Sequence, residues 1–175
     1  MIKGSTVFIS SAAVTSFMVG TWMAAKNIAP ECPAIELQEN FDTTKFGGVW
    51  YPMLMSNDLP FGPVECQTMG IDTKADGSLE SFSEWWDLDK KRFYDMNSPM
   101  ACSTWESGKC ANSFFLPNST QPNAEYVATD YETFFIMSSC IDIAGIGYMQ
   151  AIWAGSKTAY AEDSIEYKDF YDKIT

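Results

Sequence analysis

The chain has 175 residues, of which 46% are hydrophobic and 15% aromatic, and its formal net charge is −12. This length suits one domain with a sizeable core, and the acidic charge argues against binding to nucleic acid or to anionic lipid. The sequence contains no histidine, which removes the commonest general base, the Ser-His and Cys-His nucleophile pairs, and the usual haem and zinc ligands. We therefore expect no metal site and no required cofactor.

Residues 1–25 have the features of a secretory signal peptide. Lys3 precedes a largely apolar run rich in small residues, and we expect cleavage between about residues 24 and 29. An uncleaved membrane anchor is the alternative, but serines and threonines dilute the run and no basic cluster follows it. The sequence thus predicts a secreted, extracellular protein with a single domain at residues 30–175 and no stable membrane insertion after cleavage. A plastid lumen is left open as the location.

A short turn followed by a strand is predicted at residues 40–51. The Asp42 carboxylate can accept backbone N–H groups of one helical turn, and the two glycines at 47 and 48 end that turn. Trp50 then opens an apolar run, residues 50–55, which is typical of a strand.

Further strands are predicted along the rest of the chain by their apolar and aromatic content and by the turns between them. They lie at residues 66–73, 79–86, 92–97 and 110–116, followed by 126–131, 134–140 and a last strand ending near 152–157. An Asp-Gly hairpin turn is expected at residues 75–78. Residues 161–174 have apolar side chains at helical spacing, which predicts a C-terminal helix.

A glycosylation acceptor occurs at Asn118, in an Asn-Ser-Thr triplet between two prolines. The prolines predict an exposed loop, where an exported protein can be modified. The triplet is permissive for a glycan and does not require one.

Three of these segments together resemble the signature of the lipocalin family. They are residues 40–51 with Gly48 and Trp50, the Thr129-Asp130-Tyr131 turn, and residues 152–157, where Lys157 replaces the usual arginine. The flanking Cys32-Pro33 and Ser139-Cys140 are most similar to the apolipoprotein D, bilin-binding and crustacyanin-like lipocalins. This resemblance implies an all-β fold, an eight-stranded antiparallel up-and-down β-barrel with a C-terminal α-helix packed outside.

The resemblance also implies structural roles at the closed end of such a barrel. The residues concerned are Gly48, Trp50, Thr129, Asp130, Tyr131 and Lys157. We expect the Lys157 ammonium over the Trp50 ring as a cation–π partner, although it lacks the planar fork of a guanidinium. Asp130 beside Tyr131 is a candidate acid–base pair, but adjacent strand residues face opposite ways and the family uses this motif structurally. No catalytic residue is therefore predicted, and we do not expect an enzyme.

Five cysteines in an exported chain favour disulfide bridges over metal ligands. By resemblance Cys32 pairs with Cys140. The other three share one bridge at most, and we favour Cys102 with Cys110 because a Ser-Gly pair between them can turn the chain back. Cys66 is then left over, and we prefer a buried, inert thiol to an intermolecular disulfide.

The predicted ligand site is the barrel interior. By resemblance Trp153 is the first candidate for ligand contact. Its expected companions are Phe82, Trp86, Phe93, Phe115, Tyr126, Met137 and Met149. A shift of one residue in strand register would turn any of them outward, and each can instead be ordinary core. As a set they favour a flat or conjugated apolar ligand.

The sequence therefore predicts a secreted carrier of a small hydrophobic ligand, such as a fatty acid, retinoid, sterol, carotenoid or bilin. Two alternatives are kept. One is a lipocalin-fold enzyme of the de-epoxidase or isomerase type, and the other is an interaction protein whose barrel is filled by side chains. A closed interior would favour the second, and whether the chain forms a homodimer is left open.

Overall fold

The computed structural model describes residues 28–55, 64–102, 107–113, 122–143 and 147–174. The predicted signal peptide, the ligand candidate Phe115 and the glycosylation acceptor Asn118 lie outside these ranges. Among the helices within them, none is both long and apolar enough to cross a membrane.

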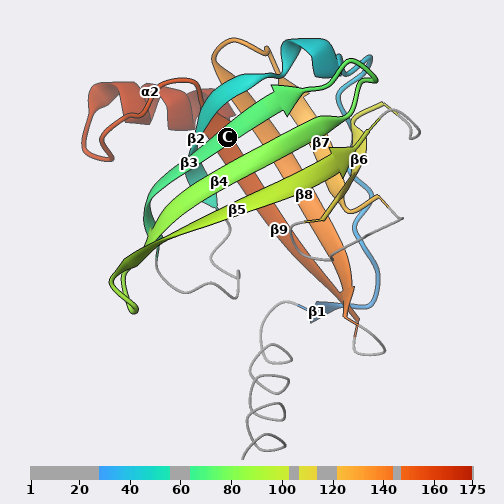
Figure 1. Cartoon of the computed structure of the whole chain (residues 1–175), viewed down its shortest axis with the longest axis horizontal. Coiled ribbons are helices and arrows are strands. Elements are labelled where there is room, and N and C mark those ends of the chain that lie inside the picture. The colour runs from blue at the N-terminus through green and yellow to red at the C-terminus, as the bar shows by residue number, and fades with distance from the viewer. Residues whose placement is uncertain (1–27, 56–63, 103–106, 114–121, 144–146, 175) are drawn as a thin grey trace, which may run out of the picture.

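Eight antiparallel strands close into a barrel (Figure 1). They are β2 (Gly48–Met55), β3 (Val64–Thr73), β4 (Leu79–Asp87), β5 (Arg92–Ala101), β6 (Lys109–Asn112), β7 (Ala124–Thr129), β8 (Phe134–Ile143) and β9 (Gly147–Ser156). Each strand pairs with the next along the chain, and β9 pairs with both β8 and β2, which closes the wall. The two-residue β1 (Ile28–Ala29) pairs with the start of β9. The predicted fold class is confirmed.

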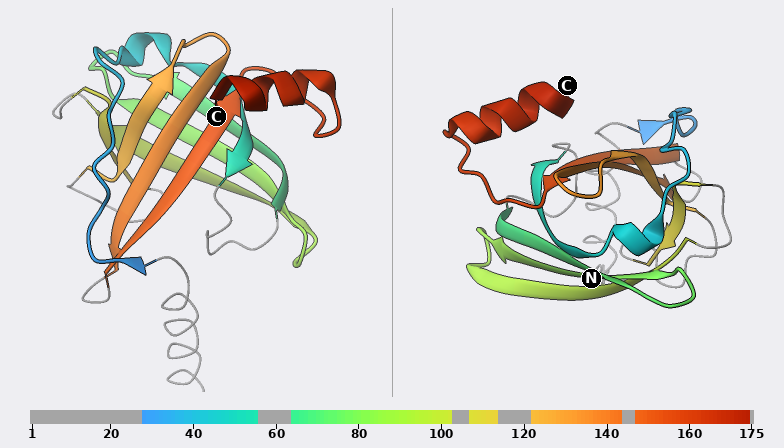
Figure 2. Two further views of the ribbon diagram at one scale, coloured as in Figure 1. Left: turned by 180° about the vertical axis from the view of Figure 1, so that it is seen from behind. Right: turned by 90° about the horizontal axis from the view of Figure 1, so that it is seen from above.

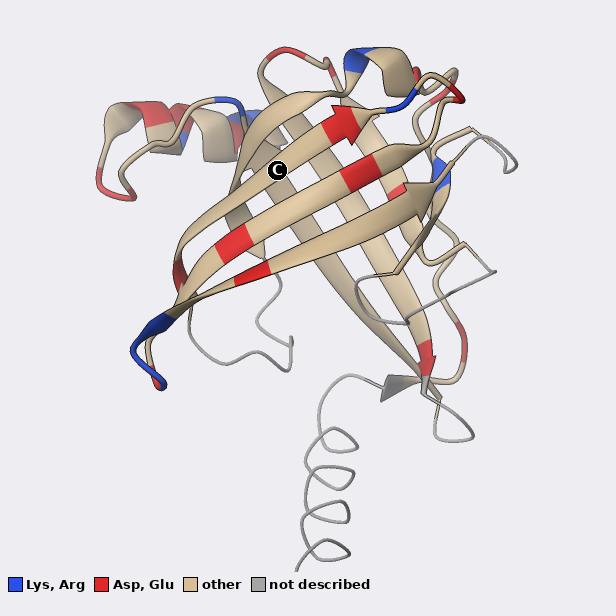
Figure 3. Ribbon diagram, in the orientation of Figure 1, with Lys and Arg blue, Asp and Glu red and all other residues tan. Residues whose placement is uncertain are grey.

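The C-terminal helix α2 (Ile165–Ile174) lies outside the barrel, as predicted (Figure 2). It begins four residues later than the apolar spacing suggested. The reason is a cap, because the Ser164 hydroxyl accepts the backbone N–H of Tyr167 at 3.0 Å and so fixes the first turn. Acidic side chains are spread over the strands and α2, whereas basic ones gather near chain turns such as the β4–β5 turn (Figure 3).

One end of the barrel is closed by aromatic rings around Trp50. Asp42 caps the 3₁₀ turn Thr43–Lys45 that crosses this end, accepting the backbone N–H of Thr44 at 3.0 Å. Phe46 follows the turn and packs its ring 5.1 Å from that of Trp50 and 4.6 Å from that of Tyr126. The Trp50 indole N–H donates to the Phe46 carbonyl at 3.0 Å, so this buried ring leaves no polar atom unpaired.

Lys157 covers the Trp50 ring from the end of β9, as predicted. Its ammonium lies 4.0 Å from the ring centroid and donates to the Gly47 carbonyl. Gly48 has φ +104°, and a Cβ there would lie 2.7 Å from the Lys157 nitrogen. The positive φ is the reason for glycine at position 48, because a Cβ there would meet only the movable end of the Lys157 side chain.

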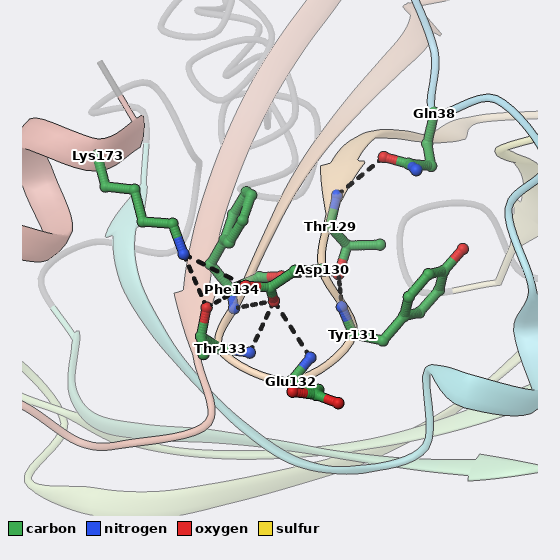
Figure 4. Close-up of polar contacts among 8 residues, drawn as sticks. All are labelled: Gln38, Thr129, Asp130, Tyr131, Glu132, Thr133, Phe134 and Lys173. Carbon is green, nitrogen blue, oxygen red and sulfur yellow. Dashed lines mark hydrogen bonds and ion pairs between the residues drawn. The ribbon is translucent and has the colours of Figure 1, made fainter.

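Asp130 organises the turn between β7 and β8. Its carboxylate accepts the backbone N–H groups of Glu132, Thr133 and Phe134 at 3.1, 2.7 and 3.0 Å (Figure 4). The Thr133 hydroxyl also donates to it, and the Lys173 ammonium of α2 lies 3.3 Å away. Partial burial opposes ionisation, but hydrogen bonds from Thr133, Phe134 and Glu132 outweigh it and hold the pKa of the Asp130 carboxyl well below its ordinary value. The Asp130 carboxylate therefore has a structural role in this turn.

The residues on either side of Asp130 tie the turn to the N-terminal segment. The Tyr131 hydroxyl accepts the backbone N–H of Asp42 at 2.8 Å. The backbone N–H of Thr129 donates to the Gln38 side chain at 3.1 Å. Segments about 90 residues apart in the chain are thereby joined at the closed end.

Both favoured disulfides are present. Cys32–Cys140 ties the N-terminal segment to β8, and Cys102–Cys110 links the end of β5 to β6. The prediction of a buried Cys66 is wrong, because this unpaired thiol is exposed. The cause is a β-bulge in β3, where two residues face one of β4, and Cys66 itself has φ +52°.

Replacing Asp130 by asparagine is expected to lower the free energy of unfolding by about 1–2 kcal/mol near pH 7, because the charge and one acceptor oxygen are lost. The side chain is 37% exposed, so solvent screening limits the contribution of the charge. Since the folded-state pKa is depressed, the stabilisation is present above about pH 4 and is lost as the pH falls through the folded-state value. Urea unfolding across pH measures this.

The matched control is Asp89→Asn in the exposed β4–β5 turn, which should change the unfolding free energy by less than about 0.5 kcal/mol. A difference between Asp130→Asn and the parent protein that is the same at pH 3 and pH 7 would contradict the assignment.

Candidate functional site

The barrel interior contains a small cavity of about 40 Å³. Its lining consists of Pro52, Gln67, Met69, Ser81, Ser83, Asn112, Phe135, Met137 and Trp153. This volume can hold a few water molecules, but it is far below the roughly 300–1,000 Å³ typical of pockets for drug-sized ligands. The barrel is thus largely filled by its own side chains in this state.

One wall of the cavity is polar and is built by a chain of hydrogen bonds across β4, β5 and β6. The Ser81 hydroxyl donates to the Ser98 carbonyl at 3.1 Å, and the Ser98 hydroxyl donates to the Asn112 side chain at 2.6 Å. Asn112 and Asn123 then exchange two side chain–backbone bonds at 2.7 and 2.8 Å. These buried groups are satisfied, which makes the wall rigid.

Two other polar side chains of the lining do not take part in these hydrogen bonds. Ser83 is buried on β4, and Gln67 belongs to the bulge of β3. Neither side chain makes a hydrogen bond, ion pair or ring contact to another residue in the part of the chain that the structure describes. An unpaired buried hydroxyl is costly, so these groups are available to orient a bound molecule.

The opposite wall is apolar and comes from β8 and β9. Met137 and Trp153 are direct partners across these strands, and both are buried against the cavity. Both residues were expected to face the interior and both do. Trp153 also pairs with Met55 of β2, so this residue lies between a partner on β8 and a partner on β2.

The inward orientation expected for Phe82, Trp86 and Phe93 is wrong. β4 pairs with β5 without a break, so alternation places Ser81 and Ser83 inside and their neighbours outside. Phe82 is 45% exposed and Phe93 is 64% exposed. Trp86 lies directly opposite Phe93, and the two rings contact on the outer face at a centroid distance of 5.0 Å. The register differs by one residue from the one assumed.

Tyr126 and Met149 are buried, but neither lines the cavity. Tyr126 belongs to the closed end, where its hydroxyl lies 3.7 Å from the Met100 sulfur and burial raises its pKa. Met149 lies opposite Ile141 of β8. They fill the core, which was the alternative for each.

Few features of the sequence indicate the polar wall. Ser81 and Ser83 alternate with Phe82, and a hydrophobic-inside rule applied to this strand assigns the aromatic ring to the core. The available signal was Leu79, a large apolar residue in step with the two serines and inside the barrel. No comparable pattern in the sequence indicates that Asn112 and Gln67 line the interior.

Comparison with known proteins gives sequence relatives of one kind and a consistent fold. No family model matches the sequence. Apolipoprotein D of Bos taurus is 27% identical over 132 residues, covering 74% of this chain and 68% of that protein. Insecticyanin from the tobacco hornworm Manduca sexta superposes with a TM-score of 0.61 at 16% identity, covering 84% of this chain and 79% of its own. Apocrustacyanin C2 superposes with a TM-score of 0.62 at 14% identity, covering 83% and 81%.

The two serines of the polar wall provide a matched pair of variants. Ser81→Ala should lower the free energy of unfolding by about 1 kcal/mol, because it removes the bond to the Ser98 carbonyl. Ser83→Ala should leave it unchanged or raise it by up to about 1 kcal/mol, because no protein bond is lost and an unpaired buried hydroxyl is removed. Urea unfolding of both variants measures the difference, and equal costs would show that Ser83 has a partner in the folded protein.

Proposed function

We propose, from the assignment to the lipocalin family that the sequence relatives and the fold support, that this protein is a carrier of a small hydrophobic ligand. The observation that carries the proposal is the two-sided lining of the cavity. Trp153 and Met137 offer apolar surface, and Ser83 and Gln67 offer uncommitted polar groups across from it. A few placed polar groups among apolar ones are typical of small-molecule sites.

Binding would be driven by removal of apolar surface from water. A ligand that buries roughly 500 Å² of apolar surface, counted on ligand and protein together, gains about 12 kcal/mol, of which about 4 kcal/mol is offset by the entropy lost on association. Affinity in the micromolar range is therefore expected, with the polar groups setting orientation. Because the cavity is only about 40 Å³, a ligand of this size has to displace side chains or occupy space beyond the cavity.

We further propose that the protein is exported. Two disulfides in the described residues favour an oxidising compartment. The predicted signal peptide at residues 1–25 and the acceptor at Asn118 agree with that location. Intact mass of protein purified from its source would report signal cleavage and glycosylation together.

An enzymatic role is less well supported than carriage. The described residues that line the cavity include no ionisable side chain, so nothing there supplies a general acid or base. Asp130, the candidate acid, is held at the closed end by the groups that hydrogen-bond to it.

A second candidate is an interaction protein, which the nearly filled interior favours. Its binding surface would include exposed aromatic residues on the outer face of β4 and β5, among them Phe82 and Phe93. The two candidates differ in one measurable property, because only a carrier binds small apolar molecules saturably.

Retinol is a suitable probe because it absorbs where tryptophan emits. We expect saturable quenching of tryptophan fluorescence with a dissociation constant on the order of micromolar. Trp153→Phe should remove a large share of the quenching, and Ser83→Ala should weaken binding by roughly threefold to tenfold if its hydroxyl bonds to ligand. Trp86→Phe on the outer face is the matched control and should leave the affinity unchanged.

If retinol binding is saturable but its quenching is unchanged by Trp153→Phe, the cavity is not the binding site. The absence of saturable binding for retinol, a sterol and a fatty acid alike would favour the interaction protein.

A further inference from the structure

The barrel wall separates between β2 and β3. The two strands pair only from Gly48 to Trp50 on β2, opposite residues 69–71 of β3. Beyond Trp50, β2 continues along β9 as far as Met55, while residues 64–68 of β3 stay with β4. The divergence of the two strands is visible in both Figures 1 and 2. Two strands that are neighbours in the barrel thus share a ladder over less than half of their length.

Local sequence explains why the ladder ends here. Pro52 has no backbone N–H to donate, and the register of β2 against β9 shifts just after it. On the facing strand, the bulge at Cys66 and Gln67 leaves one extra residue and a positive φ at Cys66. Each strand therefore carries an irregularity close to the point where their common ladder ends.

A groove of about 500 Å³ lies along this separation. Its sides come from β2 and β3, including Tyr51, Met55 and Cys66, and its outer side from the segment before α2 and the helix itself, including Tyr160 and Tyr167. The Tyr167 hydroxyl donates to the Met53 carbonyl at 3.5 Å, which spans the groove from helix to strand. The volume is within the range of small-molecule pockets.

The groove and the internal cavity adjoin. Pro52 and Gln67 line both of them, so these side chains stand between the groove and Trp153. The Gln67 side chain makes no hydrogen bond or ion pair among the described residues, so only packing holds it in place. Rotation of the Gln67 side chain is therefore the movement that would bring a molecule in the groove towards the apolar wall of the interior.

We propose that ligand enters this barrel laterally, between β2 and β3, with its body in the groove and one apolar end passing Pro52 and Gln67 to reach Trp153. The inference rests on the proposed carrier function and adds the route and the location of the bound molecule. It also explains how a barrel with so small a cavity can hold a ligand, since most of the volume lies in the wall.

The charges of the groove define the polar end of the ligand. Among the described residues, its lining contains the carboxylates Glu65 and Glu162 and no lysine or arginine. Burial, together with the nearby Glu162, raises the pKa of the Tyr167 hydroxyl, so this surface disfavours a further negative charge. The ligand class that fits is an apolar body with a neutral or cationic end, such as an alcohol or an amine, and not a free carboxylic acid.

Cys66 allows a direct test of the route, because the other four cysteines are in disulfides. The full disulfide-bonded protein is alkylated with N-benzylmaleimide, which fills the groove, or methylthiolated, which adds little volume. Retinol association is then followed by stopped-flow quenching. We expect a fall of about tenfold or more in association rate for the benzyl adduct and less than about twofold for the methylthio form. Cys66→Ser treated with the same maleimide is the control and should keep the parent rate.

The outcomes separate the two proposals. If the benzyl adduct binds retinol at the parent rate while Trp153→Phe still changes the quenching, ligand enters elsewhere and the lateral route is wrong, but the carrier function stands. If the unmodified protein shows no saturable retinol binding, the carrier function fails and the route fails with it. Near-UV circular dichroism of each adduct verifies that the fold is intact.

The head group is tested with retinol, retinylamine and retinoic acid, which share one apolar body. The acid should bind roughly threefold to tenfold more weakly than the alcohol and the amine at low salt, and Glu65→Gln with Glu162→Gln should narrow that difference. Tighter or equal binding of the acid in the parent protein would overturn the assignment of a neutral or cationic end.

Discussion

The packing of Trp50 between Phe46 and the Lys157 ammonium is the contact on which the rest of the fold depends. Trp50 lies on β2, and Lys157 directly follows β9, so this contact joins the two strands that must meet for the barrel to close. The indole N–H bonds the Phe46 carbonyl, which holds the 3₁₀ turn across the barrel end. Closure in turn fixes which face of every strand is interior.

This dependence explains what the sequence could and could not predict. The closed end is encoded by local patterns, since Asp42, Gly48 and the Asp130 turn each need a particular residue type for a reason within a few positions. The family resemblance that rests on these patterns predicted the fold, the Cys32–Cys140 disulfide and the Trp50–Lys157 contact, and a Ser-Gly turn predicted Cys102–Cys110. The orientation of β4 is set by pairing with β5, and hydrophobicity assigned it incorrectly, because Phe82 is on the outer face and Ser83 is inside. The exposure of Cys66 depends on a bulge that apolar periodicity does not reveal.

The inverted strand changes the character of the interior. With Ser81 and Ser83 in place of two aromatic rings, one wall becomes a hydrogen-bonded surface facing Trp153 and Met137. Such a wall orients a ligand more than it attracts one, so affinity must come from apolar contact elsewhere. In the proposed lateral route, the groove beside β2 would supply that contact through Tyr51, Met55 and the tyrosines of the helix region.

The helix α2 connects the closed end with this groove. Lys173, near its C-terminal end, pairs with Asp130, and Phe170 is buried. Tyr167, one turn earlier, contacts Met53 across the groove. The helix is thus held by the β7–β8 turn and forms the outer side of the space between β2 and β3. A shift of α2 away from the barrel would widen the groove without breaking any ladder pair of the eight strands, because no backbone hydrogen bond joins the helix to a strand among the described residues. The closed end around Trp50 and the groove between β2 and β3 are therefore built from separate interactions. Because β2 and β3 pair over only three residues each, the groove can form beside the closed end within one domain.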